Sequence, residues 1–490
     1  MYSLILISST PFIVRLGESR VRKIIIHSVK IGDSPDNELK TRLTYQVSSE
    51  TGHGDLWFEV DTKFADALTS DRIDSALIAI FPMALKNNYD VLESEIPISE
   101  RLYYNLTRHV IPQMYSAEGA SGKTLQISAP VTNEVFNSTG VASGMSLGVD
   151  SLATLAEYGP NSELPNYKLT HFTYFNVGAH HGYDWRIGRG KYSGRELFEG
   201  QLKKALELSN KVGIPLVVID SNLASFLSNT IGRSQFYMTH TFRNIASASI
   251  LQKMIGRYYY SAAYNLDRFT VNLSGDSATY EKWLLPYLST GSIEFFSANM
   301  AWSRFQKLQK VIEIEASHDY LMVCFVGIDN CGECDKCRKT LMMLDVLGED
   351  TLDLFKNSFD LDKYRSSFRE KLFKGIYGEM RRKGVYGADM QEMFSYAIES
   401  GFPHLQEPDL TLHKNEVTVA VTHLSVALRD LPSTLARTQK VVKQGTILRS
   451  IGKFGGWSKV TDGVDTGFVR NVGLKRIPRE PQENKESTKA

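Results

Sequence analysis

The sequence predicts an α/β protein whose central part is a parallel sheet covered by helices. Two continuous apolar runs, 171–177 and 214–220, are typical of buried strands. Between them lies a helical segment with one apolar face, formed by Phe198, Leu202, Ala205, Leu206 and Ser209. Strands that alternate with amphipathic helices favour a parallel sheet. A cluster of four cysteines predicts a metal site. A run of short strands near the carboxyl end predicts a separate β module.

The length and charge of the chain limit its class. At 490 residues it exceeds what one hydrophobic core usually supports, so several folded units are expected. Lysine plus arginine (56) nearly balances aspartate plus glutamate (55), which gives no global electrostatic reason to expect a nucleic-acid or membrane partner.

The amino-terminal stretch MYSLILISSTPFIVRL has no basic segment, and its uninterrupted apolar run is only Leu4 to Ile7. This favours a buried strand over a signal peptide. No stretch approaches the length of a membrane-spanning helix, so the sequence predicts a cytoplasmic protein without a membrane partner.

An amino-terminal α+β domain is predicted over residues 1–132. It mixes strand-like runs at 21–29 and 56–60 with an apolar, helix-like stretch at 73–84, and it carries no chemical motif. The α/β core follows at 133–347.

Beyond the core, charged and aromatic residues at helical spacing predict a helical appendage over residues 348–408. Residues 405–416 are polar, contain a proline and are expected to form a linker. The final segment, 477–490, has almost no apolar side chains and is expected to be disordered.

Residues 417–476 show an all-β pattern that resembles a bacterial SH3 domain. The segments VALRDLPST, QGTIL, GGWSKV and TGFV fall on the landmarks of that family, with matches at Arg429, Pro432, Gly445, Gly456, Trp457, Gly467 and Val469. Phe468 replaces the usual tryptophan and Leu431 the usual glycine. The resemblance implies an SH3-like β-barrel, and a small barrel that serves only for packing is the alternative.

The segment TGVASGMSLGVDSLATL (139–155) places glycines and small residues between a short strand and a helix. Backbone N–H groups of such a turn, with the positive end of a helix, can hold an anion. Ser146 and Ser151 add hydroxyl donors, and Gly148 lets the backbone approach a phosphate without a β-carbon. No lysine follows the glycines, so the Walker A pattern is absent. The pattern predicts a phosphate-binding loop, with a structural helix cap as the alternative.

Within that loop, SLGVDS resembles the SGGxDS signature of the PP-loop ATP pyrophosphatases, whose fold is adenine nucleotide alpha hydrolase-like. Ser146, Gly148, Asp150 and Ser151 match the signature, Leu147 replaces its first glycine, and Val149 takes its variable position. The resemblance implies that the loop binds ATP, that AMP is transferred to a substrate oxygen and that pyrophosphate is released. Asp150 would help to bind Mg²⁺ on the pyrophosphate group.

The sequence CFVGIDNCGECDKC places Cys324, Cys331, Cys334 and Cys337 in a C-x6-C-x2-C-x2-C arrangement. Four thiolates can close a tetrahedral shell around Zn²⁺, and two-residue spacers let neighbouring sulfurs converge on one ion. All four positions are then filled by protein, so the zinc is expected to be structural. An iron–sulfur cluster and unliganded thiols are the alternatives.

A PP-loop followed by this cysteine pattern resembles the 7-cyano-7-deazaguanine synthase branch of the class, over about 210 of the 490 residues. FNVGAHH (175–181) aligns Gly178 and His181 with the family's FDYGQRH, and TFRN (241–244) aligns Arg243 and Asn244 with PGRN. Asp276 lies near a family aspartate. Val177 and Ala179 replace the family's tyrosine and glutamine, which indicates an altered base pocket.

The resemblance implies roles for these residues. Asp150, Ser151 and Arg243 are expected to be catalytic, and the nucleotide-binding set is Ser146, Leu147, Gly148, Val149, Asp150, Ser151, Gly178, His181 and Asn244. Taken alone, His181 is also typical of a surface loop, and Arg243 of an ion pair with a nearby carboxylate.

The biosynthetic family activates a carboxylate as an acyl-adenylate and uses ammonia twice, giving an amide and then a nitrile. This chain is longer and is similar to the extended proteins of the Qat and type IV CBASS anti-phage systems. The leading hypothesis is ATP-dependent activation of a 7-carboxy-7-deazaguanine-like carboxylate, with the acceptor amine on a partner protein. The alternatives are the nitrile-forming enzyme, another PP-loop reaction such as tRNA modification, and a non-catalytic nucleotide-sensing assembly module.

Overall fold

A computed structural model describes residues 21–120, 122–179, 192–232, 235–355, 360–383, 387–405, 411–430, 432 and 438–478. The predicted strand at Leu4–Ile7, residues 406–410 of the predicted linker and the tail beyond residue 478 lie outside the described residues. The linker prediction is wrong for residues 411–416, because they belong to strand β13 (Thr411–Val421).

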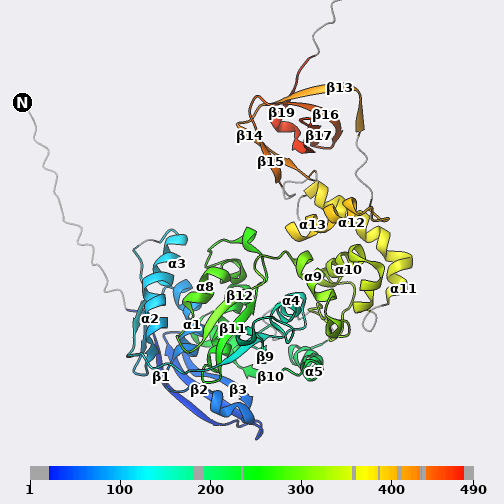
Figure 1. The fold of residues 1–490 in the computed structure, drawn as a ribbon. Coiled ribbons are helices and arrows are strands. Elements are labelled where there is room, and N and C mark those ends of the chain that lie inside the picture. Colours follow the sequence, from blue (N-terminus) through cyan, green and yellow to red (C-terminus); the bar gives the residue numbers. More distant parts are fainter. Residues whose placement is uncertain are drawn as a thin grey trace, which may run out of the picture.

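Five parallel strands form one half of a ten-stranded sheet (Figure 1). They are β8 (Gly140–Gly144), β9 (His171–Asn176), β10 (Leu216–Ser221), β11 (Ile255–Ser261) and β12 (Glu294–Ala298). Across the sheet their order is β12-β11-β8-β9-β10, and every neighbouring pair is parallel. Within this half the chain begins at β8, adds β9 and β10 on one side and then adds β11 and β12 on the other. The connections after β8 and β11 therefore run in opposite directions, and they diverge between these two strands. The predicted α/β class with a large parallel sheet is confirmed.

Helices cover both faces of this sheet. The side chains of β10 alternate between two hydrophobic clusters, with Val217 and Ile219 in one and Leu216 and Val218 in the other. The first cluster includes residues of α1 (Asp74–Lys86), α7 (Phe236–Ser249) and α8 (Glu281–Tyr287). The second includes residues of α4 (Val149–Tyr158), α5 (Gly194–Val212) and α9 (Arg304–Ile312).

The helix predicted between the second and third core strands is α5. The prediction for one residue of its apolar face is wrong, because that residue is exposed. Phe198, Ala205 and Ser209 are buried, but Leu206 is 41% exposed. Leu206 follows Ala205 directly and so lies about 100° further round the helix, while Leu208 points to the sheet.

Amino-terminal strands extend the same sheet. β1 (Lys23–Asp33), β2 (Lys40–Ser49) and β3 (Gly52–Asp61) form an antiparallel meander, and β3 pairs with β10. β4 (Val91–Ser94) and β6 (Gln126–Ser128) complete that edge, β5 (Ile98–Ser99) and β7 (Val131–Thr132) form a small second sheet, and α2 (Glu100–Asn105) and α3 (Ile111–Ala117) lie beside them. The division at residue 132 stays a prediction, and strands from both sides of it share one sheet.

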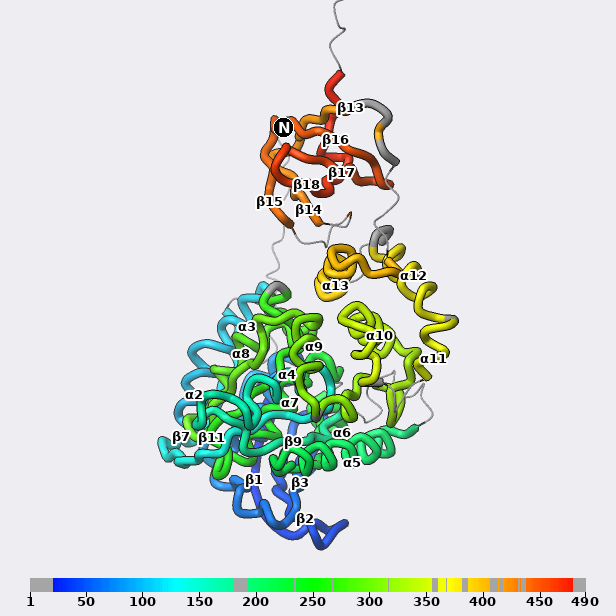
Figure 2. The backbone as a smooth tube through the Cα atoms, turned by 45° about the vertical axis from the view of Figure 1, so that its right-hand side comes forward, coloured from blue at the N-terminus to red at the C-terminus, as the bar shows by residue number. Residues whose placement is uncertain are grey.

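A group of helices follows the core. α10 (Asp335–Leu347), α11 (Leu361–Lys363), α12 (Arg369–Lys383) and α13 (Ala388–Glu399) lie between the sheet and the carboxyl-terminal strands in both views (Figures 1 and 2). Tyr364, Leu372 and Ile376 are buried in the same cluster as α4 and α9. These helices therefore pack on the core.

The C-terminal module, residues 411–478, is a separate antiparallel sheet of seven strands with its own small core. Its strands are β13 (Thr411–Val421), β14 (Ser425–Arg429), β15 (Thr438–Lys443), β16 (Ile447–Phe454), β17 (Trp457–Thr461), β18 (Thr466–Arg470) and β19 (Leu474–Arg476). None of the helices in the described part of the chain has both the length and the apolar character needed to cross a bilayer.

The separate core of the C-terminal module leads to a prediction. A chain that ends at Glu407 should stay folded, because Val419, Leu428 and Val460 bury their side chains within the module and not against the helices. We expect thermal unfolding to show an unchanged main transition for the shortened chain. Aggregation of that chain would show that the module is part of the packing of the core.

Candidate functional site at the carboxyl edge of the parallel sheet

The β8–α4 loop, residues 145–148, lies where the connections of the sheet diverge. β8 ends at Gly144, and the Met145 N–H donates to the Thr173 carbonyl of β9 (2.9 Å). α4 begins at Val149, directly after Gly148. In open α/β sheets ligands bind outside the carboxyl ends of the strands at this switch point. The first N–H groups of a helix have no partner within the helix, so the start of α4 offers donors to an anion.

Leu147 gives the loop its shape. Its φ angle is +62°, a left-handed conformation that is rare for a residue with a β-carbon and costs roughly 1–2 kcal/mol. The side chain is fully buried in the cluster beneath the sheet, and the Leu147 carbonyl accepts a hydrogen bond from the Met322 N–H (2.8 Å). Burial and this bond offset the strain where the related signature has glycine.

Small polar groups line the loop. Ser146 is exposed, and its hydroxyl lies 3.3 Å from that of Ser151, which also donates to the Gly148 carbonyl (3.0 Å). A β-carbon on Gly148 would lie 3.4 Å from the Ser146 hydroxyl, which is an ordinary van der Waals contact. Leu147 and Val149 are buried and can contribute only backbone groups to a ligand.

Two cations meet the carboxylate of Asp150 in the first turn of α4. Arg304 Nη1 lies 3.0 Å from one carboxylate oxygen and Lys307 Nζ lies 3.1 Å from the other. Lys307 is 1% exposed and also donates to the Ala262 carbonyl after β11. Burial raises the pKa of Asp150, but Lys307 and Arg304 outweigh it and hold that pKa below its usual range. The carboxylate is therefore charged at neutral pH.

Sequence reasoning missed Arg304 and Lys307, although a signal was present. Both lie near the start of α9. Ser303 and Gln306 cap this end of the helix with a reciprocal capping box. The positive end of a helix dipole disfavours basic residues there, so two of them indicate a nearby anion. Here that anion is Asp150.

A polar cluster at the end of β11 contains Asn244 and Asp276, two residues that were matched to the family. Asn244 Nδ2 lies 3.5 Å from the Tyr260 hydroxyl, and His240 lies 3.2 Å from that hydroxyl and 2.9 Å from Asp276. Tyr264 donates to the other oxygen of Asp276 (3.2 Å). Burial raises the pKa of Asp276, but the hydrogen bond and charge of His240 outweigh it and lower that pKa. Burial, with the Asp276 charge, raises the pKa of Tyr264 to about 12.

Arg243 and Gly178 meet, but Arg243 is fully buried. Its Nη1 donates to the Val177 carbonyl (2.9 Å) and its Nε to the Thr239 hydroxyl (2.8 Å). Gly178 has φ +116°, and a β-carbon there would collide with the Arg243 guanidinium. Arg243 therefore fixes the turn after β9. His181 lies outside the described residues.

Glu281 is a buried carboxyl group near the same edge. It is fully buried at the start of α8, one oxygen accepts from Ser297 (3.3 Å), and the other has no hydrogen-bond partner among the described residues. Burial raises its pKa to about 8, which the charges of Lys282 and Lys307 only partly oppose. Glu281 is thus mainly protonated at neutral pH.

The four predicted cysteines converge. The sulfur atoms of Cys324, Cys331, Cys334 and Cys337 all lie within 4.8 Å of one another, and those of Cys331 and Cys337 are 4.0 Å apart. Tetrahedral zinc with bonds of about 2.3 Å places its sulfurs about 3.8 Å apart. The N–H groups of Cys334 and Cys337 point to the sulfurs of Cys331 and Cys334 (3.3 and 3.5 Å). The cluster could hold a metal ion such as zinc.

The segment before the cysteines supports the β8–α4 loop. Met322 bonds to the loop two residues before Cys324. Asn330 accepts from the N–H groups of Val323 (2.9 Å) and Cys324 (3.2 Å) and donates to the Leu321 carbonyl (2.7 Å). The metal cluster and the loop are therefore parts of one packed unit.

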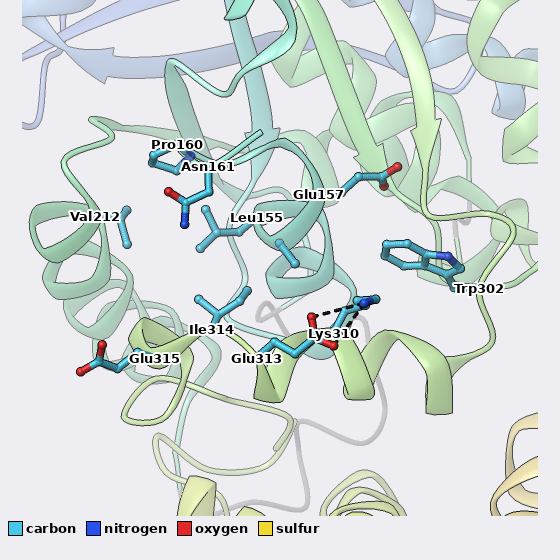
Figure 3. Close-up of a pocket in the computed structure, with 12 residues that line it drawn as sticks. Leu155, Glu157, Pro160, Asn161, Val212, Trp302, Lys310, Glu313, Ile314 and Glu315 are labelled. Carbon is cyan, nitrogen blue, oxygen red and sulfur yellow. Dashed lines mark hydrogen bonds and ion pairs between the residues drawn. The ribbon is translucent and has the colours of Figure 1, made fainter. Parts of the chain in front are cut away.

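A hollow lies at the end of α4 that is opposite to the β8–α4 loop (Figure 3). It has a volume of about 750 Å³, and Leu155 and Asn161 face Trp302 and Ile314 across it. Lys310 and Glu313, on its rim, pair with each other (3.1 Å). Because the ten residues of α4 span about 15 Å, this hollow is distinct from the β8–α4 loop.

Comparison of the chain with models of protein families, with curated proteins and with solved structures finds no match.

The burial of Glu281 leads to a prediction about pH. A carboxyl group whose pKa rises from 4.5 in the unfolded chain to about 8 in the fold stabilises fully below pH 4.5, and this stability is lost as the pH rises through 8. We expect the free energy of unfolding to fall over this range by at most about 1.4 kcal/mol per pH unit. Chemical denaturation should show a flatter profile for Glu281→Gln, whereas Glu313→Gln, at an exposed carboxylate, should keep the wild-type slope.

The cysteine cluster leads to a second prediction. Metal analysis should find about one zinc per chain. Cys334→Ser should lose the metal and lower the unfolding temperature, since structural zinc contributes on the order of 10 kcal/mol in small peptide sites. Glu333→Gln changes an exposed neighbour and should affect neither property. Iron in the purified protein, or no metal, would contradict the zinc assignment.

Proposed function

We propose that the chain is an ATP-consuming, AMP-forming enzyme whose nucleotide phosphates bind at the β8–α4 loop. The observation that carries this proposal is the convergence of Arg304 and Lys307 on Asp150, beside the loop and the first turn of α4.

The charges at this point suit a polyphosphate with a divalent cation. The first turns of α4 and α9 both contribute to the site, and each is the positive end of a helix dipole. Two side-chain cations against one carboxylate leave a net positive charge for phosphate oxygens. Asp150 supplies the oxygen ligands that Mg²⁺ prefers, and Mg²⁺ would neutralise charge on the leaving pyrophosphate.

The type of reaction comes from the resemblance of SLGVDS to the PP-loop signature. A carboxylate oxygen of the substrate attacks the α-phosphorus, and the bond from that phosphorus to the bridging oxygen breaks. Pyrophosphate leaves, and an acyl-adenylate remains. An amine nitrogen then attacks the acyl carbon, AMP leaves, and the nitrogen loses a proton. Arg304 and Lys307 would stabilise the charge that develops on the leaving group.

We further propose that the substrate is a deazapurine-like carboxylate and that the amine belongs to a protein. The resemblance to the 7-cyano-7-deazaguanine synthase branch supports the first part. The polar groups of Asn244, Tyr260 and Asp276 at the end of β11 are suited to hydrogen-bond with a heterocyclic ring. The SH3-like pattern of the C-terminal module supports a protein partner. The zinc would be structural.

This proposal predicts that the purified chain converts ATP to AMP and pyrophosphate when its substrate is present. Asp150→Asn and Lys307→Met should each lower the rate at least about a hundredfold, because removing one electrostatic contact to the transition state commonly costs about 3 kcal/mol. Ser151→Ala should lower the rate in the same direction. Pyrophosphate release and nucleotide chromatography measure both products.

The same helix offers a matched control. Lys310→Met removes an exposed lysine of α9 whose only ion-pair partner among the described residues is Glu313, so it should keep the wild-type rate. If Lys307→Met fails to fold, Arg304→Gln tests the same contact at a more exposed side chain. Formation of ADP and phosphate would overturn the proposal, and nucleotide binding without turnover would favour a sensing module.

A further inference from the structure

The C-terminal module carries a strong positive charge, although the net charge of the whole chain is almost zero. Residues 411–478 contain eleven lysines and arginines but only four aspartates and glutamates, a net charge of +7. The whole chain has a net charge of +1, so the remaining residues carry −6. A module of this charge attracts anionic partners at short range.

Most of these cations form no ion pair with any residue that the structure describes. Lys440 pairs with Asp462 and Asp465, which uses two of the four acidic side chains of the module. Six others are exposed and form no ion pair with any described residue: Lys443, Arg449, Lys453, Arg470, Lys475 and Arg476. The positive charge is therefore available at the surface.

Two small hollows lie among these cations, on either side of the short turn η11 (Asn471–Gly473). The first, of about 180 Å³, is lined by Trp457, Val426 and Val472 and has Arg470 on its edge. The second, of about 100 Å³, includes Lys453 and Arg476. Each hollow thus combines apolar surface with cations.

The exposed apolar side chains and the buried rings indicate the kind of anion. Val472 is 72% exposed and Leu424 is 87% exposed, so an apolar contact surface lies at or near the first hollow. Trp457 is 8% exposed and Phe468 is 3% exposed, so neither ring offers a face on which a base could stack. This combination fits a peptide with acidic and apolar residues better than a nucleic acid.

We propose that the C-terminal module binds an extended acidic segment of a partner protein across the η11 turn. The carboxylates of that segment pair with Arg470 on one side and with Lys453 and Arg476 on the other. An apolar side chain of the segment enters the hollow against Trp457 and Val472. This interaction does not depend on ATP turnover. It can therefore be tested separately from the proposed reaction.

Fluorescence anisotropy with the full chain tests the proposal. The probe is a fluorescein-labelled peptide of repeated Glu-Leu-Glu units, compared with peptides of Glu-Gly-Glu and Lys-Leu-Lys units. We expect the first to bind, the second to bind more weakly because it lacks the apolar side chain, and the third not to bind. Binding should weaken as the salt concentration rises.

Variants then locate the surface. Lys453→Glu combined with Arg470→Glu should raise the Kd at least about tenfold, and Val472→Glu should raise it as well. Lys443→Glu combined with Arg449→Glu makes the same change in charge at cations that line neither hollow, so it should change the Kd much less. None of these variants should alter ATP turnover.

Three results would overturn the proposal. One is an absence of peptide binding by the full chain. Another is an equal loss of affinity in the two charge-reversal pairs, which would show unspecific attraction. The third is tighter binding of single-stranded RNA with the same number of charges, which would make nucleic acid the partner.

Discussion

The ion cluster of Asp150, Arg304 and Lys307 is the contact on which the site depends. It joins the start of α4 to the start of α9, helices whose paired residues are 154 and 157 positions apart in the chain. Lys307 also binds the carbonyl after β11, so segments that follow three different strands meet at one buried amine. Removing one partner of a buried ion pair leaves a charge without compensation, which costs several kcal/mol. The ion cluster therefore forms only when β8, β11 and β12 are in place.

A second constraint on the β8–α4 loop is its contact with the segment that precedes the cysteine cluster. Leu147 keeps a left-handed backbone because its side chain is buried and its carbonyl is held by Met322. Met322 in turn belongs to a segment whose backbone is fixed by Asn330 and by the cysteine cluster. A metal ion there would act at a distance from any nucleotide, through the shape of the loop. This connection explains how a cluster with four protein ligands, and no open position for chemistry, can matter for the site.

Local patterns in the sequence predicted the parts of the fold that depend on local physics. Continuous apolar runs gave β9 and β10, and cysteine spacing gave the four converging sulfurs. Contacts between distant segments were not predicted, since neither Arg304 nor Lys307 belongs to the motif that contains Asp150. The contact between Gly178 and Arg243 was not predicted either, and motif matching contains no information on burial. Arg243 proved to be fully buried under the turn, and Leu206 proved to be exposed.

The nearly neutral total charge shows why a global sum is a weak guide to partners. At physiological salt, electrostatic interactions between exposed charges fade over about 8 Å, so a partner responds to the patch that it meets and not to the whole chain. Here the sum of +1 combines a module of +7 with a remainder of −6. The module can therefore attract an anionic partner although the whole chain is almost neutral.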